Sequence, residues 1–94
     1  MMKISASEQV QGWLAVLPPQ TKKNLRAVLH ALERDAYLIE PLENELDGFY
    51  KVKFEDIRLI CQPAASPRGP VLNLVFVQRR ATVYDEFKII LGLK

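Results

Sequence analysis

The chain has few cysteine and histidine residues and no long apolar run. Cys61 is its only cysteine and His30 its only histidine, so an intrachain disulfide or a multi-cysteine zinc site is excluded, and we predict no metal and no cofactor. The most apolar run, 71–77, is short and interrupted by Asn73, and the first residues contain no apolar segment of signal-peptide length. We therefore expect a cytoplasmic protein with no membrane partner.

An excess of charge of one sign is also missing. The 94 residues include 13 Lys and Arg against 11 Asp and Glu, a formal net charge of +2. A charge this small does not by itself indicate a nucleic-acid partner, so what matters is whether positive charge is gathered in one place. With 49% hydrophobic and 26% charged residues, the composition is that of an ordinary globular domain, and we expect one domain over residues 1–94.

Helical periodicity predicts two helices near the N-terminus. Ser5 and Glu8 have the spacing of a capping box, and apolar residues follow at helical intervals, which predicts a helix from about Ala6 to Leu17. Pro18-Pro19 ends this helix, and Pro19 suits the first turn of a second helix, where no amide hydrogen is needed. The second helix is expected to end near Asp35.

The second half of the chain predicts an antiparallel sheet and a closing helix. The expected elements are an acidic connector at 36–47, strands at 49–54, 57–62 and 71–79, a proline-rich loop at 63–70, and a helix at 83–91. Leu42 and Leu46 are placed to hold the connector to the core, Thr82 to cap the last helix, and residues 2–4 to add a short first strand. The predicted fold is α+β, with two N-terminal helices packed on a small antiparallel sheet of three to four strands.

One hairpin concentrates positive charge. If Glu55-Asp56 forms a two-residue turn, Lys53 lies opposite Arg58. Side chains alternate along strands, so one face of this hairpin is apolar and suited to cover by the two helices. That face holds Tyr50, Val52, Phe54, Ile57, Leu59 and Cys61. The other face carries Lys51, Lys53 and Arg58 beside Phe49 and Ile60.

Two interpretations of the charged face remain open. It is either the solvated side of a half-covered sheet or a phosphate-binding surface on which an exposed Phe49 stacks a base. Like charges directly opposite each other destabilise a sheet by a few tenths of a kcal/mol, which favours the second interpretation. Glu43, Glu45 and Asp47 could neutralise the cations, but the sequence does not fix where the connector lies.

Three segments together resemble the RelE/ParE superfamily of bacterial toxins. They are LPPQTKKNLRAVLHALER, LENELDGFYKVKFEDIRLIC and LVFVQRRATVYDEF, and the resemblance extends from Trp13 to Phe87. The characteristic sequence pattern of this superfamily is G-Y-K-apolar-K, then aromatic-Arg-apolar, then Arg followed by Val-Tyr. The resemblance implies a RelE-like fold and a toxin of a type II toxin–antitoxin system that acts as a metal-independent, ribosome-dependent mRNA endonuclease.

The resemblance also implies roles for individual residues. The catalytic residues would be Lys51, Lys53, Arg58, Arg79 and Tyr84, and the RNA-binding residues Phe49, Lys22, Lys23, Arg26 and Arg80. Lys53 or Lys51 would be the general base or an electrostatic substitute for one, and Tyr84 would orient the RNA or stack on a base. Arg58 and one further arginine would hold the phosphate. Arg79 and Arg80 point to opposite sides of a strand, so only one of them can join the site.

The resemblance further implies partners and leaves alternatives. The partners would be the ribosome with its mRNA and a cognate antitoxin, in a heterotetramer or larger complex. The antitoxin would bind through an amphipathic segment that covers the cationic face or displaces the closing helix. A ParE-like protein that inhibits DNA gyrase by binding, and a non-catalytic RNA- or ribosome-binding module, are the alternatives.

Overall fold

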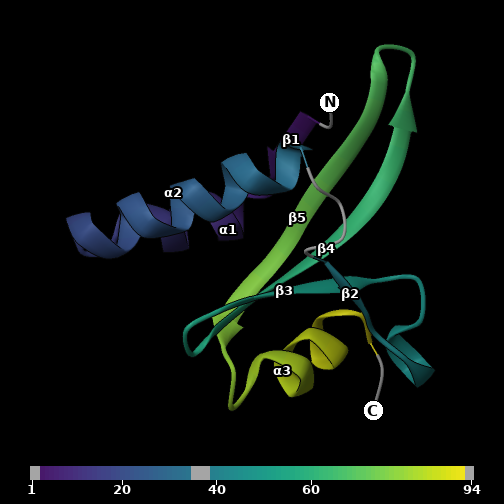
Figure 1. Cartoon of the computed structure of the whole chain (residues 1–94). Coiled ribbons are helices and arrows are strands. Elements are labelled where there is room, and N and C mark those ends of the chain that lie inside the picture. Colours follow the sequence, from purple (N-terminus) through teal and green to yellow (C-terminus); the bar gives the residue numbers. More distant parts are fainter. Residues whose placement is uncertain (1–2, 35–38, 93–94) are drawn as a thin grey trace.

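The computed structural model describes residues 3–34 and 39–92, which form a five-stranded sheet with three α-helices (Figure 1). The strand order is β1-β5-β4-β3-β2. The elements are β1 (Lys3–Ala6), α1 (Glu8–Ala15), α2 (Pro19–Arg34), β2 (Glu40–Pro41), the 3-10 helix η2 (Asn44–Leu46), β3 (Tyr50–Phe54), β4 (Ile57–Ser66), β5 (Gly69–Arg79) and α3 (Val83–Ile90). The predicted α+β class is confirmed, but the sheet has five strands rather than three to four.

The first strand makes the sheet mixed rather than purely antiparallel. β1 pairs with β5 in parallel, with Ser5 opposite Asn73. Because Ser5 lies in this strand, the predicted capping box is wrong. Ser7 is the N-cap instead: its Oγ accepts a hydrogen bond from the amide of Val10 at 3.3 Å and donates one to the carbonyl of Val75 at 3.1 Å.

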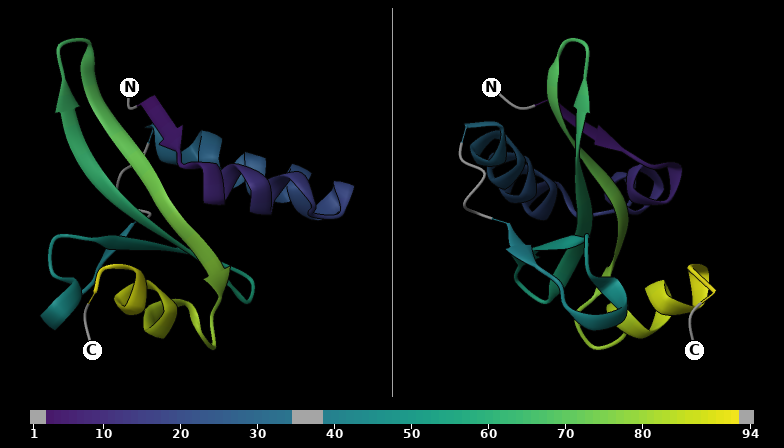
Figure 2. Two further views of the ribbon diagram at one scale, coloured as in Figure 1. Left: turned by 180° about the vertical axis from the view of Figure 1, so that it is seen from behind. Right: turned by 90° about the vertical axis from the view of Figure 1, so that its right-hand side faces the viewer.

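The two N-terminal helices otherwise follow the sequence. α1 is shorter than the predicted 6–17 and ends at Ala15, and α2 starts at Pro19 as predicted. Its predicted end at Asp35 lies outside the described residues. None of the helices in the described ranges is long and apolar enough to cross a membrane. The corner between α1 and α2 projects away from the strands (Figures 1 and 2).

The β3–β4 hairpin has the predicted register. Lys53 lies opposite Arg58, and the two-residue turn places Glu55 at φ 55°. The apolar face of this hairpin packs against α1 and α2, as expected, through Val10, Leu25 and Leu32. The buried strand residues of this core are Val52, Phe54, Ile57, Leu59, Cys61, Leu72, Leu74 and Val77. This packing leaves the opposite face of the hairpin free of α1 and α2.

That opposite face is partly covered by a second, smaller core. α3 contributes Val83 and Phe87, and the connector contributes Leu42 and Leu46, so the predicted role of these two leucines is confirmed. Ile60, Phe76 and Phe49 complete this core from the strand side. The prediction that Phe49 is exposed is therefore wrong. Its ring is half-buried and meets the ring of Phe87 edge to face, with 5.0 Å between the centroids.

The proline-rich stretch 63–70 is not the predicted loop. β4 and β5 continue as a pair through it, and the hairpin closes only beyond Ser66 opposite Gly69. This long hairpin extends beyond the rest of the sheet (Figures 1 and 2). β3 pairs with β4 only as far as Cys61, so Pro63 lies where one edge of β4 has no strand beside it among residues 3–34 and 39–92. An edge tolerates the missing amide hydrogen of proline, which explains why the strand continues.

Candidate functional site

Three cations line one face of the β3–β4 hairpin. Lys51 and Lys53 are two residues apart on β3, and Arg58 lies directly opposite Lys53 on β4. We call Lys51, Lys53 and Arg58 the cationic row. On β5 the residue across from Arg58 is Gln78, which no sequence pattern had indicated. The row therefore crosses the sheet and ends in an uncharged hydrogen-bonding side chain.

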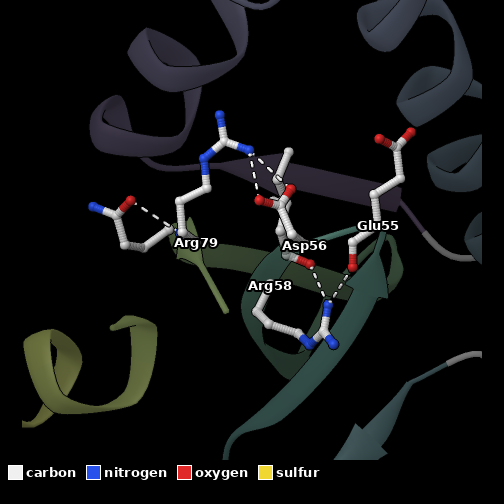
Figure 3. A network of polar contacts seen from close by, with 6 residues as sticks. Glu55, Asp56, Arg58 and Arg79 are labelled. Carbon is white, nitrogen blue, oxygen red and sulfur yellow. Dashed lines mark hydrogen bonds and ion pairs between the residues drawn. The ribbon is translucent and has the colours of Figure 1, made fainter. Parts of the chain in front are cut away.

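Arg58 is the buried member of the row. The residue is 8% exposed, the only buried charged residue in the described parts of the chain. Its Nη1 donates hydrogen bonds to the backbone carbonyls of Glu55 and Ile57, both at 2.9 Å (Figure 3). These bonds hold the guanidinium against the turn, and no carboxylate within residues 3–34 and 39–92 forms an ion pair with it. A charge fixed in this way, with its water largely removed, interacts strongly with an incoming anion.

A carboxylate that was not predicted lies between the two lysines. Glu40 in β2 is directly opposite Lys51 in the sheet. Its Oε2 is 3.7 Å from Nζ of Lys51 and 3.4 Å from Nζ of Lys53. Of the acidic connector residues considered from the sequence, Glu45 pairs instead with Lys88, at 3.3 Å. In the part of the chain that the structure describes, the row's three positive charges thus have one negative charge nearby, that of Glu40, which leaves an excess of positive charge at one place on the sheet.

Arg79 lies on the opposite face from the row. It is directly across from Ile57, which packs against the helices. Its Nη1 donates to both oxygens of Asp56, at 2.8 and 3.0 Å, and its guanidinium carbon lies 5.5 Å from the centre of the Trp13 ring. Figure 3 shows the side chains of Arg58 and Arg79 pointing away from each other. The prediction that Arg79 joins Lys51, Lys53 and Arg58 is therefore wrong.

Arg80 is the remaining arginine at this end of β5. It follows the last strand residue, is exposed, and donates its backbone amide to the carbonyl of Asp56 at 2.6 Å. Its side chain makes no ion pair with any carboxylate in residues 3–34 and 39–92. Strand alternation places Arg79 on the helix side, so of the two arginines considered for the site only Arg80 is not excluded by the strand pairing.

Tyr84 lies beside the row, as predicted. It is in the first turn of α3, and its ring centre is 5.9 Å from Nζ of Lys51. The ring is half-buried because it also packs against the second core. A cation next to an aromatic face is a favourable contact, so Lys51 and Tyr84 hold each other in position.

The basic residues of α2 are not brought to the row. α2 packs on the other face of the sheet, and Lys22, Lys23 and Arg26 lie in its first half, which projects away from the strands (Figure 1). Nζ of Lys22 donates to the carbonyl of Ala15 at 3.1 Å and so satisfies the C-terminal end of α1. These three residues therefore do not extend the cationic surface.

Neither Cys61 nor His30 adds a reactive group to the row. Cys61 is buried in the helix-side core, and this burial raises the pKa of its thiol to about 12, so the thiol stays protonated at neutral pH. His30 is exposed on α2, 4.0 Å from Glu33. The side chains available at the site are therefore those of lysine, arginine and tyrosine together with the carboxylate of Glu40, and the excess of positive charge suits binding of a phosphodiester.

Comparison with known proteins gives a fold. No protein-family model matches the chain, and no curated protein gives a significant match. Among solved structures, the YoeB/ParE toxin from Agrobacterium tumefaciens superposes with a TM-score of 0.67, at 13% identity over 83% of this chain and 98% of that chain. The chain has the fold of the RelE/ParE toxins.

Two toxin–antitoxin complexes contain the same RelE/ParE fold. One is the complex RelBE2 from Mycobacterium tuberculosis, with a TM-score of 0.62 and 21% identity over 84% of this chain and 98% of that chain. The other is the archaeal RelE–RelB complex from Pyrococcus horikoshii, with a TM-score of 0.62 and 17% identity over 84% of this chain and 94% of that chain. At such identities a shared RelE/ParE fold does not establish a shared activity.

The contact of Glu40 with both lysines leads to a prediction. A phosphate on the row must compete with this carboxylate, so Glu40→Gln is expected to raise the affinity for a short 2′-O-methyl RNA by roughly two- to fivefold. The affinity can be measured by fluorescence anisotropy at low salt. Glu33→Gln on α2 is the matched control and should leave the affinity unchanged. Weaker binding by Glu40→Gln would show that this carboxylate helps to hold the RNA.

Proposed function

We propose that this protein is the toxin of a type II toxin–antitoxin system and that it cleaves mRNA on the ribosome. The observation that carries the proposal is the cationic row, three cations on one sheet face with the carboxylate of Glu40 between two of them and Tyr84 at their side. The fold shared with RelE/ParE toxins supports it. The partners are the ribosome with its mRNA and, by analogy with the two complexes of similar fold, an antitoxin.

The reaction needs only the RNA and protein side chains. The 2′-oxygen attacks the adjacent phosphorus, the bond from phosphorus to the 5′-oxygen breaks, and the products are a 2′,3′-cyclic phosphate and a 5′-hydroxyl. A base accepts the proton of the 2′-hydroxyl, and an acid supplies a proton to the departing 5′-oxygen. Fixed positive charge stabilises the additional negative charge that develops on the phosphoryl oxygens in the transition state.

We assign these tasks to the residues of the row and to two residues outside it, Tyr84 and Arg80. Arg58 is held rigidly by two carbonyls and is the phosphate clamp. Lys51 or Lys53 is the base or its electrostatic substitute, and Tyr84 orients the nucleotide next to Lys51. Arg80 is the second arginine of the site in place of Arg79. The ribosome supplies the rest of the alignment, since an open sheet face holds free RNA weakly.

The proposal is tested by removing members of the row. Lys53→Ala and Arg58→Ala should each relieve translation arrest at least roughly tenfold, because each removes charge that contacts the phosphate. Arrest is measured as amino-acid incorporation after induction. Arg68→Ala, at the tip of the β4–β5 hairpin, is the matched control and should arrest translation like the unaltered protein.

The design separates folding from function. Arg58 is buried, so its variant needs a circular dichroism and thermal-melting check. The side chain of Lys53 is 53% exposed, and its replacement should leave the fold intact. Full arrest by a folded Lys53→Ala variant and a folded Arg58→Ala variant would remove the row from the mechanism. DNA breaks with an SOS response would favour a ParE-like gyrase inhibitor. Ribosome binding with intact mRNA would favour a non-catalytic RNA- or ribosome-binding module.

The placement of Arg79 gives a separate prediction. Arg79→Ala should retain translation arrest, since its guanidinium contacts Asp56 and Trp13 on the helix side. It should lower the free energy of unfolding by roughly 0.5–1 kcal/mol, the usual value of an exposed contact between a cation and an aromatic ring. Chemical denaturation and the incorporation assay together check this. Loss of arrest at unchanged stability would return Arg79 to the site.

A further inference from the structure

An open hollow adjoins the cationic row at Lys51. It lies between the connector that contains η2 and the helix α3, and its volume is about 460 Å³, within the range of small-molecule sites. Among the residues that line it are Leu42, Asn44, Glu45, Tyr84 and Lys88. Lys51 belongs to both the hollow and the row, so the two adjoin at this side chain.

The hollow and the row differ in charge. Two carboxylates, of Glu43 and Glu45, and two ammonium groups, of Lys51 and Lys88, line the hollow, so its formal charge is balanced. Glu45 and Lys88 pair directly, at 3.3 Å. The row, in contrast, has three cations against Glu40. An anionic group is therefore favoured on the row, and a neutral group that forms hydrogen bonds is favoured in the hollow.

The walls of the hollow suit a flat aromatic group. Leu42 and Leu46 are buried apolar residues that line the hollow, and Tyr84 contributes a half-buried ring. The amide of Asn44 adds both a donor and an acceptor, a combination able to read the edge of a base. Stacking on an aromatic side chain is a common contribution to the binding of single-stranded nucleic acid.

The rim of the hollow is fixed by local backbone structure. Asn44 adopts φ 58°, a left-handed conformation that asparagine tolerates well. The amide of Leu46 donates to the carbonyl of Glu43 at 3.2 Å, and the amide of Asp47 donates to that of Asn44 at 3.1 Å. The polar side chains of the connector are thus presented by a defined turn, as a site with base preference requires.

We propose that this hollow is a nucleobase-binding site, which holds the base of the nucleotide whose phosphate lies on the cationic row. Asn44, Glu45 and Lys88 determine which base is preferred. The inference rests on the proposed recognition of RNA and adds to it a source of sequence preference that belongs to the protein itself. Arg58 and Lys53 contact the phosphate and do not distinguish bases.

Nuclear magnetic resonance of the full chain tests the site without any need for cleavage. The probes are the four nucleoside 5′-monophosphates, ribose 5-phosphate and inorganic phosphate. All six should shift the amide signals of 51–53 and 58. Only the nucleotides should also shift those of 42–46 and 84–88, because only they carry a base. Nucleotides that shift the same signals as ribose 5-phosphate, or no probe that shifts 42–46, would overturn the proposal.

A charge-balanced double variant tests the determinants of preference. For the unaltered protein we expect the affinities for the four nucleotides to differ by roughly fivefold between the tightest and the weakest, and we call this ratio the spread. Glu45→Ala with Lys88→Ala removes both members of the pair and should reduce the spread to less than about twofold. The affinity for ribose 5-phosphate should not change. Glu33→Ala with Arg34→Ala on α2 is the control and should keep the spread.

The outcomes keep the two proposals apart. An unchanged spread in the folded Glu45→Ala, Lys88→Ala variant would contradict the base-binding role of this pair. Base-dependent binding by a protein that never cleaves mRNA would retain the nucleobase site and reject the endonuclease. Cleavage that depends on the row, with no base-dependent shift of the amide signals at the hollow, would retain the endonuclease and reject the nucleobase site.

Discussion

The two-residue turn between β3 and β4 is the constraint on which the rest of the structure depends. Glu55 adopts φ 55°, and this turn sets Lys53 opposite Arg58. A shift of one residue would move every side chain of the shifted strand to the other face of the sheet. The register therefore does two things at once: it buries Leu59 and its neighbours under α1 and α2, and it gathers three cations on the other face. Arg58 reinforces the turn by bonding to the carbonyl of Glu55.

The energetic cost of this arrangement is small compared with the core that enforces it. Like charges across a strand pair cost a few tenths of a kcal/mol, whereas burial of one large apolar side chain contributes roughly 1.5–3 kcal/mol. Glu40 further reduces the repulsion between Lys51 and Lys53. The second core under α3 covers Ile60 and Phe76, and both lysines of the row keep part of their side chains exposed. The sheet can thus keep a partly exposed cationic surface without losing its stability.

Sequence patterns predicted the features that depend on residues close together in the chain. Alternation of side chains and the length of the turn were enough for the β3–β4 register, and Pro19 was enough for the start of α2. Most contacts between distant segments were not predictable in this way, although the packing of Leu42 and Leu46 against the core was. Glu40 reaches the lysines because β2 pairs with β3, and the sequence does not place a two-residue strand.

The remaining errors have physical causes in the sheet itself. Pro63 suggested a loop because proline lacks an amide hydrogen and fits a strand only at a free edge. Whether β4 has a free edge at Pro63 depends on where β3 ends, which the sequence does not show. The face of Arg79 follows from the pairing of β4 with β5, which includes an irregularity between Ile60 and Cys61 that no sequence pattern announced. Ser5 was assigned to a cap because the parallel pairing of β1 is a contact across most of the chain. The three cations on the predicted hairpin thus have the expected register, whereas the exposure of Phe49 and the face of Arg79 depend on distant elements and differ from the prediction.

The central claim is that an RNA phosphate occupies the cationic row and is cleaved there. Sequencing of mRNA 5′-ends after induction, from ribosome-bound and free fractions, tests it most directly. The account predicts new 5′-hydroxyl ends within translated codons in the ribosome-bound fraction, and their absence in cells that express the Lys53→Ala variant. Intact messages beside full translation arrest, or the same ends with Lys53→Ala, would contradict it.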